Sequence, residues 1–209
     1  MNQSMEIRVH KNQRLIDETF IPIEKIEQSL MRISLIKYGR RIAHGSGVVA
    51  NNRIYSAWHV LKKENEYDEM IIQINQKISL TIPKKIVIHN STNDIASIEL
   101  PEEMRHVKQA SWSNVQVRPM DYVIAAGFPK IHPQNNQPEV SFHILQIVDG
   151  GKGFYNAMCA DDTMIIPGGI SGAAVFNTFG EVIGLCVASD PRRTIGNHHM
   201  LKITKTTMI

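Results

Sequence analysis

Residues Gly45–Val60 read GSGVVANNRIYSAWHV, and this stretch decides the fold class. A glycine-rich start leads into an apolar run, the Asn51-Asn52 pair turns the chain, and a second run ends on His59. Two apolar runs joined by a short asparagine turn are typical of a β-hairpin. The sequence therefore predicts two antiparallel strands here, with a histidine where the second one ends.

The same pattern extends along the chain in both directions. Short segments rich in Ile and Val are broken by Asn, Gly, Pro or charged turns at roughly eight- to twelve-residue intervals, which is typical of β-barrels and sandwiches. The first group of expected strands is 31–38, 42–50, 53–58, 70–75, 78–83, 85–89 and 95–100. The second group is 115–117, 122–127, 140–148, 157–160, 173–177, 182–189 and 200–203. We therefore expect an all-β chain, with a short helix at Ile23–Leu30 ahead of the first strand.

Length and composition exclude several classes of protein. The 209 residues, 43% of them hydrophobic, suffice for one large domain or two small ones. The net charge of +3 comes from scattered basic residues, so no nucleic-acid partner is expected. No run approaches the roughly 20 apolar residues that cross a bilayer, so no membrane role is expected. Residues 1–20 carry frequent charges and lack the apolar core of an export signal, and there are only two cysteines, so we expect a cytoplasmic protein.

Two further stretches carry candidate chemistry. DIASIEL, at Asp94–Leu100, opens on an acidic residue directly after the turn-forming Asn90–Asn93 cluster. PGGISGAAVFNTFGEVIGL, at Pro167–Leu185, places a glycine-rich loop before Ser171 and a hairpin after it. Hydrolysis of an amide by a serine needs a nucleophile, a base, an acid that orients the base, and amide donors for the oxyanion. The three stretches together contain a candidate for each of these roles.

The three stretches resemble the motifs of the trypsin-like serine proteases, and they occur in that family's order of His, Asp and Ser. SGAAVFNTFGEVIGL is similar to the bacterial branch that includes the high-temperature-requirement proteases. The resemblance covers about 31–203 and implies two six-stranded antiparallel Greek-key β-barrels with the active site in the cleft between them. It implies an N-terminal extension at 1–30, a first barrel at 31–105 and a second barrel at 106–209.

The same resemblance implies a catalytic triad of His59, Asp94 and Ser171. In such a triad the histidine takes the proton of the serine hydroxyl, and the aspartate holds the opposite ring nitrogen while staying ionised. The amides of Gly169 and Ser171 would bind the oxyanion. The chain is thus expected to be a serine endopeptidase that acts on proteins or peptides through an acyl-enzyme, with no metal or cofactor.

By the same alignment, the substrate pocket is lined by uncharged residues, namely Ile165, Ile166, Gly168, Val187, Ala188 and Ser189. An apolar pocket does not repay the desolvation of a charged side chain, so we expect cleavage after small or medium apolar residues. Asp161 and Asp162 keep an alternative open, because either carboxylate could reach the base of the pocket and select basic residues.

Two positions depart from the family pattern. Ile170 stands where activated trypsins carry the aspartate that binds a newly freed N-terminus, so that ion pair is not expected. Val187 stands where relatives commonly have a Ser or Thr that helps to hold the triad aspartate. Control of activity is therefore expected from another source, such as a regulatory domain or a partner protein.

Four alternatives depend on single features. A protease-fold binding module with weak or no activity stays open because Val187 is unusual. A viral-type main protease also stays open, although Cys186–Ser189 lacks the histidine that many of those enzymes place in the pocket wall. An α/β-hydrolase is disfavoured because Ala173 replaces the second glycine of its nucleophile motif. A metal site at His198-His199 is disfavoured because adjacent residues of a strand point to opposite faces.

Overall fold

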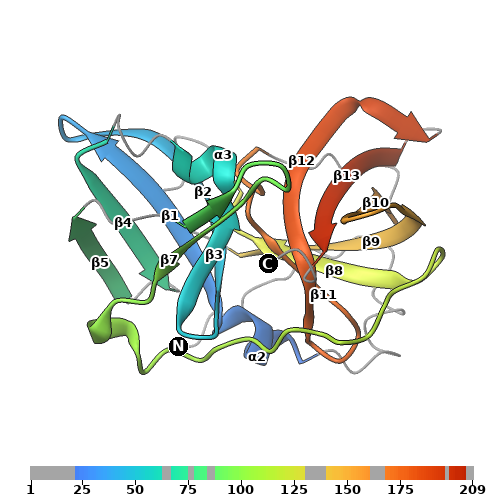
Figure 1. Cartoon of the computed structure of the whole chain (residues 1–209), viewed down its shortest axis with the longest axis horizontal. Helices are drawn as coiled ribbons and strands as arrows, with labels where there is room; N and C mark the ends of the chain where they lie inside the picture. The colour runs from blue at the N-terminus through green and yellow to red at the C-terminus, as the bar shows by residue number, and fades with distance from the viewer. Residues whose placement is uncertain are drawn as a thin grey trace, which may run out of the picture.

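A computed structural model of the chain confirms the all-β prediction. It describes residues 22–62, 67–74, 78–83, 88–129, 140–160, 168–195 and 198–205, without the side chains of 78, 83, 188–195 and 198–199. The described strands form two units, a seven-stranded sheet and a closed six-stranded barrel. The barrel has the expected six strands, whereas the first unit is a sheet of seven described strands in place of the expected six-stranded barrel. Figure 1 shows these units side by side, with the sheet in blue to green and the barrel in yellow to red.

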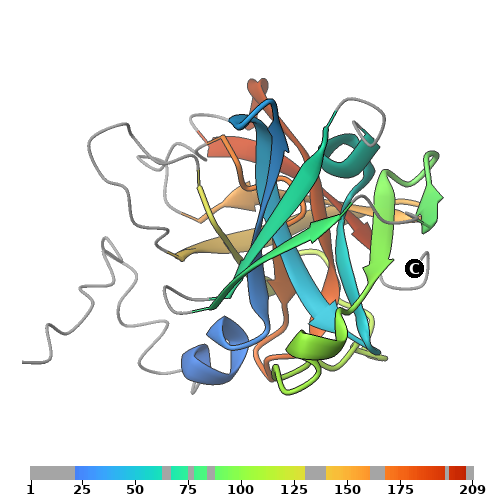
Figure 2. The same ribbon diagram turned by 90° about the vertical axis from the view of Figure 1, so that its left-hand side faces the viewer.

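The first unit contains the seven strands between Leu30 and Glu99. These are β1 (Leu30–Lys37), β2 (Arg40–Ala50), β3 (Arg53–Ala57), β4 (Glu69–Ile74), β5 (Ile78–Pro83), β6 (Ile88–Asn90) and β7 (Ile95–Glu99). Their order in the sheet is β5-β4-β1-β2-β3-β7-β6, and every neighbouring pair is antiparallel. Seen from the side, β4 and β5 cross in front of the strands behind them, so the sheet coils instead of lying flat (Figure 2).

The turn between β2 and β3 is the one predicted from the asparagine pair. Asn51 and Asn52 have φ angles of +47° and +57°, and Ala50 pairs with Arg53 across them. A two-residue hairpin turn of this kind needs a left-handed φ at both central positions, which asparagine tolerates better than most residues. This prediction is confirmed. The turn sets the register of β3, whose end leads directly to His59.

The second unit contains six strands that close into a barrel. They are β8 (Tyr122–Gly127), β9 (Ser141–Gly150), β10 (Phe154–Cys159), β11 (Ala174–Phe176), β12 (Val182–Ile195) and β13 (His198–Lys205), in the closed order β10-β13-β12-β11-β8-β9. A connector that includes the short 3-10 helix η2 (Glu102–Met104) joins the units. The strand predicted at 115–117 is wrong. Val115 is 58% exposed whereas Val117 is buried, so the two valines do not share one face as they would in a strand.

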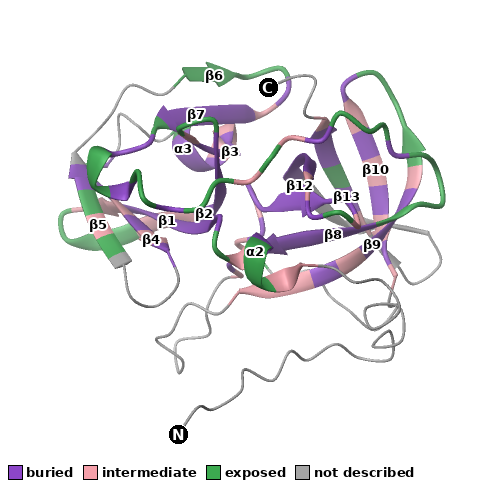
Figure 3. Ribbon diagram, turned by 90° about the horizontal axis from the view of Figure 1, so that it is seen from below, coloured by how far each residue is buried: buried purple, intermediate pink, exposed green. Residues whose placement is uncertain are grey.

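Among the described residues, three apolar clusters stabilise the two units. One lies inside the coiled sheet and includes Ile33 and Ile98, and a second fills the barrel around Leu145. The third joins the units, because Val48 of the sheet packs in the same cluster as Phe176 of the barrel. In Figure 3 buried residues dominate β3, β7 and β8, whereas β6 is exposed along its length.

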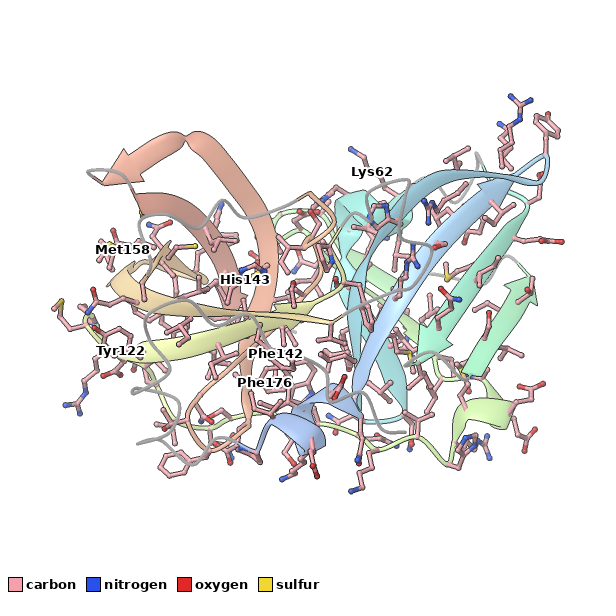
Figure 4. The ribbon with its side chains drawn as sticks, turned by 180° about the vertical axis from the view of Figure 1, so that it is seen from behind. Lys62, Tyr122, Phe142, His143, Met158 and Phe176 are labelled. Carbon is pink, nitrogen blue, oxygen red and sulfur yellow. The ribbon has the colours of Figure 1, made fainter. Side chains whose placement is uncertain are left out.

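Helix α2 (Ile23–Glu27) packs at the junction of the units. Ile26 is 1% exposed and belongs to the joining cluster, against which Phe142 also packs. Phe142 and Phe176 are labelled in Figure 4, close to this helix. The helix predicted ahead of the first strand is confirmed, but it ends at Glu27 because Leu30 already begins β1.

Candidate active site

His59 lies in a single-turn helix immediately after β3. Helix α3 (Trp58–Leu61) begins where the strand ends, and its Val60 and Leu61 pack into the core of the first sheet. The His59 side chain is 37% exposed. The sequence predicted that the strand continues through Trp58, which is wrong. The Trp58 N–H instead donates to the carbonyl of Asp94 at 2.9 Å, and the chain turns at this point.

Asp94 lies in the turn before β7, and both of its carboxylate oxygens contact His59. Oδ2 is 2.6 Å from Nδ1 of the ring, and Oδ1 accepts a hydrogen bond from the backbone N–H of His59 at 2.8 Å. A carboxylate on Nδ1 makes that nitrogen the donor and leaves Nε2 to accept a proton. The structure therefore brings together the predicted base and the predicted acid that orients it.

Ser171 lies in a tight turn before β11 that packs against the first sheet. Its carbonyl oxygen accepts a hydrogen bond from the backbone N–H of Ser46 on β2 at 2.9 Å. The next residue, Gly172, has a φ of +80°, and a Cβ there would lie 2.9 Å from the Ala57 backbone nitrogen. Glycine fits such a close approach of two backbones because it has no side chain. The predicted nucleophile is thus held beside the strand that leads to His59.

The hydroxyl of Ser171 makes no hydrogen bond with the ring of His59 within the part of the chain that the structure describes. Hydrogen bonds of this kind are often long in enzymes without substrate and tighten when the substrate binds. Two of the three predicted triad residues are therefore in direct contact, and the third is held nearby through its backbone.

Ser46 is a site residue to which the sequence pattern assigned no role. Its side chain is fully buried, and its hydroxyl donates to the Gly169 carbonyl at 3.1 Å and accepts from the Phe128 N–H at 2.8 Å. The first sheet thereby holds the loop before Ser171 through one serine. The glycines on either side of Ser46 were the only hint in the sequence. A Cβ on Gly45 would lie 2.8 Å from the Val60 side chain and 3.0 Å from the Ser171 carbonyl oxygen, so this segment is closely packed.

The loop that carries the predicted oxyanion amides is fixed on several sides. Gly169 has a left-handed φ of +94°. Ile170 is 3% exposed and packs into the barrel core. The Gly172 N–H donates to the Cys186 carbonyl at 2.7 Å, and the Ala173 N–H donates to the Ile170 carbonyl at 2.9 Å. An apolar side chain thus anchors the loop at the position where activated trypsins use an ion pair.

The predicted pocket residues fall only partly within the described chain. Four residues lie outside it, namely Asp161, Asp162, Ile165 and Ile166. Gly168 is exposed at the start of the described loop, and Val187 is 4% exposed and packs into the core of the first sheet. Ala188 and Ser189 continue β12, and their side chains are not described.

The two cysteines are buried thiols and do not compete with Ser171 as nucleophiles. Burial, with a smaller contribution from the nearby Cys159, raises the pKa of the Cys186 thiol to about 12. A thiol with such a pKa stays protonated at neutral pH, whereas the thiolate is the nucleophilic form.

In the described ranges we find no group of three side chains suited to hold a metal ion and no helix long and apolar enough to cross a membrane.

A cavity of about 550 Å³ lies apart from these residues, beside the connector between the units. Its lining includes Tyr55 and Trp112, whose rings meet edge to face with centroids 4.9 Å apart. None of His59, Asp94 and Ser171 contributes to it. The cavity is therefore separate from the candidate site.

Solved structures of bacterial proteases are similar to this chain. The serine endoprotease from Yersinia pestis superposes with a TM-score of 0.69 at 17% identity, over 89% of this chain and 61% of that one. The active form of the Rv3671c protease from M. tuberculosis superposes with a TM-score of 0.69 at 13% identity, over 91% and 82%. The inactive form of the same protease gives a TM-score of 0.63 at 13% identity, over 94% and 89%. The predicted chymotrypsin-like fold is confirmed, and the chain spans 61% of the length of the Yersinia structure.

Sequence comparison places the chain in a family, although no curated protein sequence matches it. Residues 45–185, more than half of the chain, match the model of a trypsin-like peptidase domain. This range contains His59, Asp94 and Ser171. The chain therefore belongs to the family of proteins with a trypsin-like peptidase domain.

Proposed function

We propose that the chain is an active serine endopeptidase whose catalytic triad is His59, Asp94 and Ser171. A first domain at 31–105 supplies the histidine and the aspartate, a second domain at 106–209 supplies the serine, and 1–30 is an extension. The observation that carries the proposal is the double contact of Asp94 with the ring and the backbone of His59, at 2.6 and 2.8 Å. The backbone contact fixes the carboxylate, whose second oxygen meets the ring at Nδ1 and leaves Nε2 to work as a base.

In the proposed reaction, Nε2 of His59 takes the proton of the Ser171 hydroxyl as its oxygen attacks the peptide carbonyl. The oxyanion that forms is bound by the N–H groups of Gly169 and Ser171. The imidazolium then protonates the leaving amine, which breaks the peptide bond and leaves an acyl-enzyme. Water hydrolyses this ester by the same steps, and Asp94 stays ionised throughout.

The proposed enzyme needs no proteolytic processing to assemble its loop. The burial of Ile170 in the barrel core and the hydrogen bond from Ser46 to Gly169 support this part of the proposal. The first contact lies within the second domain and the other joins the two domains, and neither involves a free N-terminus. Activity is then controlled by access to the site, for which a regulatory domain or partner protein is the candidate.

Proteins or peptides cleaved after small or medium apolar residues are the proposed substrates. The uncharged residues expected around the pocket support this preference, because a buried charge would lack a partner there. Sequencing the products from a random peptide library tests it. Enrichment of Lys or Arg before the cut would show that Asp161 or Asp162 reaches the pocket, and replacing both by Asn should then abolish that selectivity.

The cytoplasm is the proposed location. The buried, thiol state of Cys159 and Cys186 supports it, since secreted proteases of this size often depend on disulfides. Fractionation of cells that express the full-length protein tests this placement. Recovery with exported proteins would contradict it.

Covalent labelling by a fluorophosphonate probe tests the activity itself. Wild-type protein should be labelled at one residue, identified as Ser171 by peptide mapping, and Ser171→Ala should not be labelled. Ser113→Ala is the matched control, because it removes a buried serine hydroxyl far along the chain from the loop. An unlabelled but folded wild type would contradict the proposal and favour a binding module.

A further inference from the structure

Asp94 has an unusual backbone conformation, with a φ of +53°. Aspartate tolerates a left-handed φ better than most residues, but less well than glycine, so surrounding contacts are needed to hold it. The direction of the carboxylate follows from this backbone geometry. The orientation of His59 therefore depends on how the two peptide groups on either side of Asp94 are fixed.

The peptide group after Asp94 is fixed from within the first sheet. Its carbonyl oxygen accepts the hydrogen bond from the Trp58 N–H at 2.9 Å. The ring of Trp58 also stacks on His89 of β6, with centroids 3.8 Å apart and planes 6° from parallel. Trp58 thus contacts both ends of the turn, through its N–H at Asp94 and through its ring at β6.

The peptide group before Asp94 is fixed from the barrel. Its carbonyl oxygen, that of Asn93, accepts a hydrogen bond from the Thr204 hydroxyl at 2.6 Å. Thr204 is 0% exposed and Asn93 is 9% exposed, so water is poorly placed to substitute for this hydroxyl. The N–H of the same peptide group makes only a long hydrogen bond, 3.4 Å to the Ser91 carbonyl.

Thr204 faces the first sheet because of its place on β13. Side chains alternate along a strand, and Leu201 and Ile203 of β13 pack in the barrel core. Thr204 therefore points to the other side, toward the turn that carries Asp94. Val187 of β12 also packs toward the first sheet, but it has no hydroxyl to donate.

We propose that Thr204 is a positioning residue for Asp94 and replaces the hydroxyl that Val187 lacks. It acts through the Asn93–Asp94 peptide group instead of the carboxylate, and it couples docking of the barrel to the geometry of the His59–Asp94 pair. The proposal rests on the catalytic role proposed for His59 and Asp94.

Steady-state kinetics of Thr204→Val and Thr204→Ser form the first test. Valine keeps the shape of threonine and removes the hydroxyl, so kcat should fall about tenfold with KM within about twofold of wild type. Serine keeps the hydroxyl and should retain kcat within about threefold. Ser113→Ala should lower thermal stability and leave kcat unchanged. An unchanged kcat in Thr204→Val, or equal losses in both Thr204 variants, would overturn the proposal.

Proton NMR of the His59–Asp94 hydrogen bond is the second test, and it needs no turnover. The Nδ1–H proton of His59 should give a strongly downfield signal in wild type, in Thr204→Ser and in Ser113→Ala. It should move upfield or broaden in Thr204→Val, or in Thr204→Ala if the valine variant does not fold. If wild type is inactive but the signal responds in this way, the positioning role stands and the catalytic proposal fails. If wild type is active and the signal ignores Thr204, the positioning role fails alone.

Discussion

Asp94 binds His59 at two points, through Oδ2 at 2.6 Å from the ring Nδ1 and through Oδ1 at 2.8 Å from the backbone nitrogen. The backbone contact requires an acceptor of the right shape, whereas the ring contact requires an acceptor that keeps Nδ1 protonated. An amide in place of the carboxylate can still accept the backbone hydrogen bond through its oxygen. Its NH₂ group would then face Nδ1 as a donor, so the ring contact would reverse its direction. The two contacts can therefore be separated by one substitution.

Asp94→Asn should lower kcat by about 10³- to 10⁴-fold and change KM much less, because an amide NH₂ facing Nδ1 stabilises the wrong ring tautomer. Hydrolysis of a fluorogenic peptide measures both constants, with Ser171→Ala as the background rate. Unfolding in urea checks that the variant keeps its fold. A loss of less than about tenfold would contradict the proposed role of Asp94.

Ser46→Ala should slow labelling of Ser171 by a fluorophosphonate about tenfold and lower the free energy of unfolding by about 1 to 3 kcal/mol. The substitution leaves the Gly169 carbonyl and the Phe128 N–H without the hydroxyl that each contacts. Ser113→Ala is the matched control, since Ser113 is also buried and its hydroxyl contacts Glu181 and Asn177. Equal slowing in both variants would attribute the effect to general destabilisation.

Local patterns predicted the parts of the fold that depend on neighbouring residues. The Asn51-Asn52 pair predicted its hairpin because the φ angles it needs are a property of two residues. The glycines around Ser171 predicted a tight loop for the same reason. The pairing of His59 with Asp94 was also predicted, because the family resemblance relates the two stretches that contain them. Neither residue alone would have indicated the other.

The missed features depend on contacts between distant parts of the chain. Thr204 contacts Asn93 only because the barrel docks on the sheet, and nothing in the sequence near either residue signals it. The same holds for Ser46 and the loop at Gly169. The strand predicted at 115–117 failed because alternating valines indicate a strand only where both lie on one buried face, whereas Val115 is exposed and Val117 is buried.

Gly172→Ala should abolish activity and lower the free energy of unfolding by roughly 3 kcal/mol or more. A Cβ at this position would lie 2.2 Å from the Ser46 carbonyl oxygen and 2.3 Å from the Ser56 hydroxyl, and the φ of +80° is itself unfavourable for alanine. Gly151→Ala is the control, because nothing lies within 4 Å of a Cβ there. Urea unfolding and probe labelling measure the two effects. A Gly172→Ala protein that labels at the wild-type rate would show that the loop can move without loss of function.

His143 should make the protein less stable in mild acid. Burial in the barrel, where it is 4% exposed, lowers the pKa of this ring from 6.5 to about 4, and its Nε2 lies 2.9 Å from the Ser141 hydroxyl oxygen. Figure 4 labels it on the barrel side of the molecule. In the unfolded chain the ring binds a proton near pH 6.5, whereas the folded ring does so only near pH 4. Between these values the unfolded state holds the extra proton, so acidification favours unfolding.

This one ring should lower the free energy of unfolding by about 2 kcal/mol between about pH 8 and pH 5. The loss should be complete below about pH 4 and negligible above about pH 6.5. Urea unfolding at several pH values measures it, with His143→Gln as the comparison. A difference in stability between the two proteins at pH 8 does not affect the test. All other titrating groups are shared, so the difference between the two slopes reports His143 alone. Wild type should lose more stability than His143→Gln as the pH falls, and parallel curves would mean that the ring takes up its proton without unfolding the barrel.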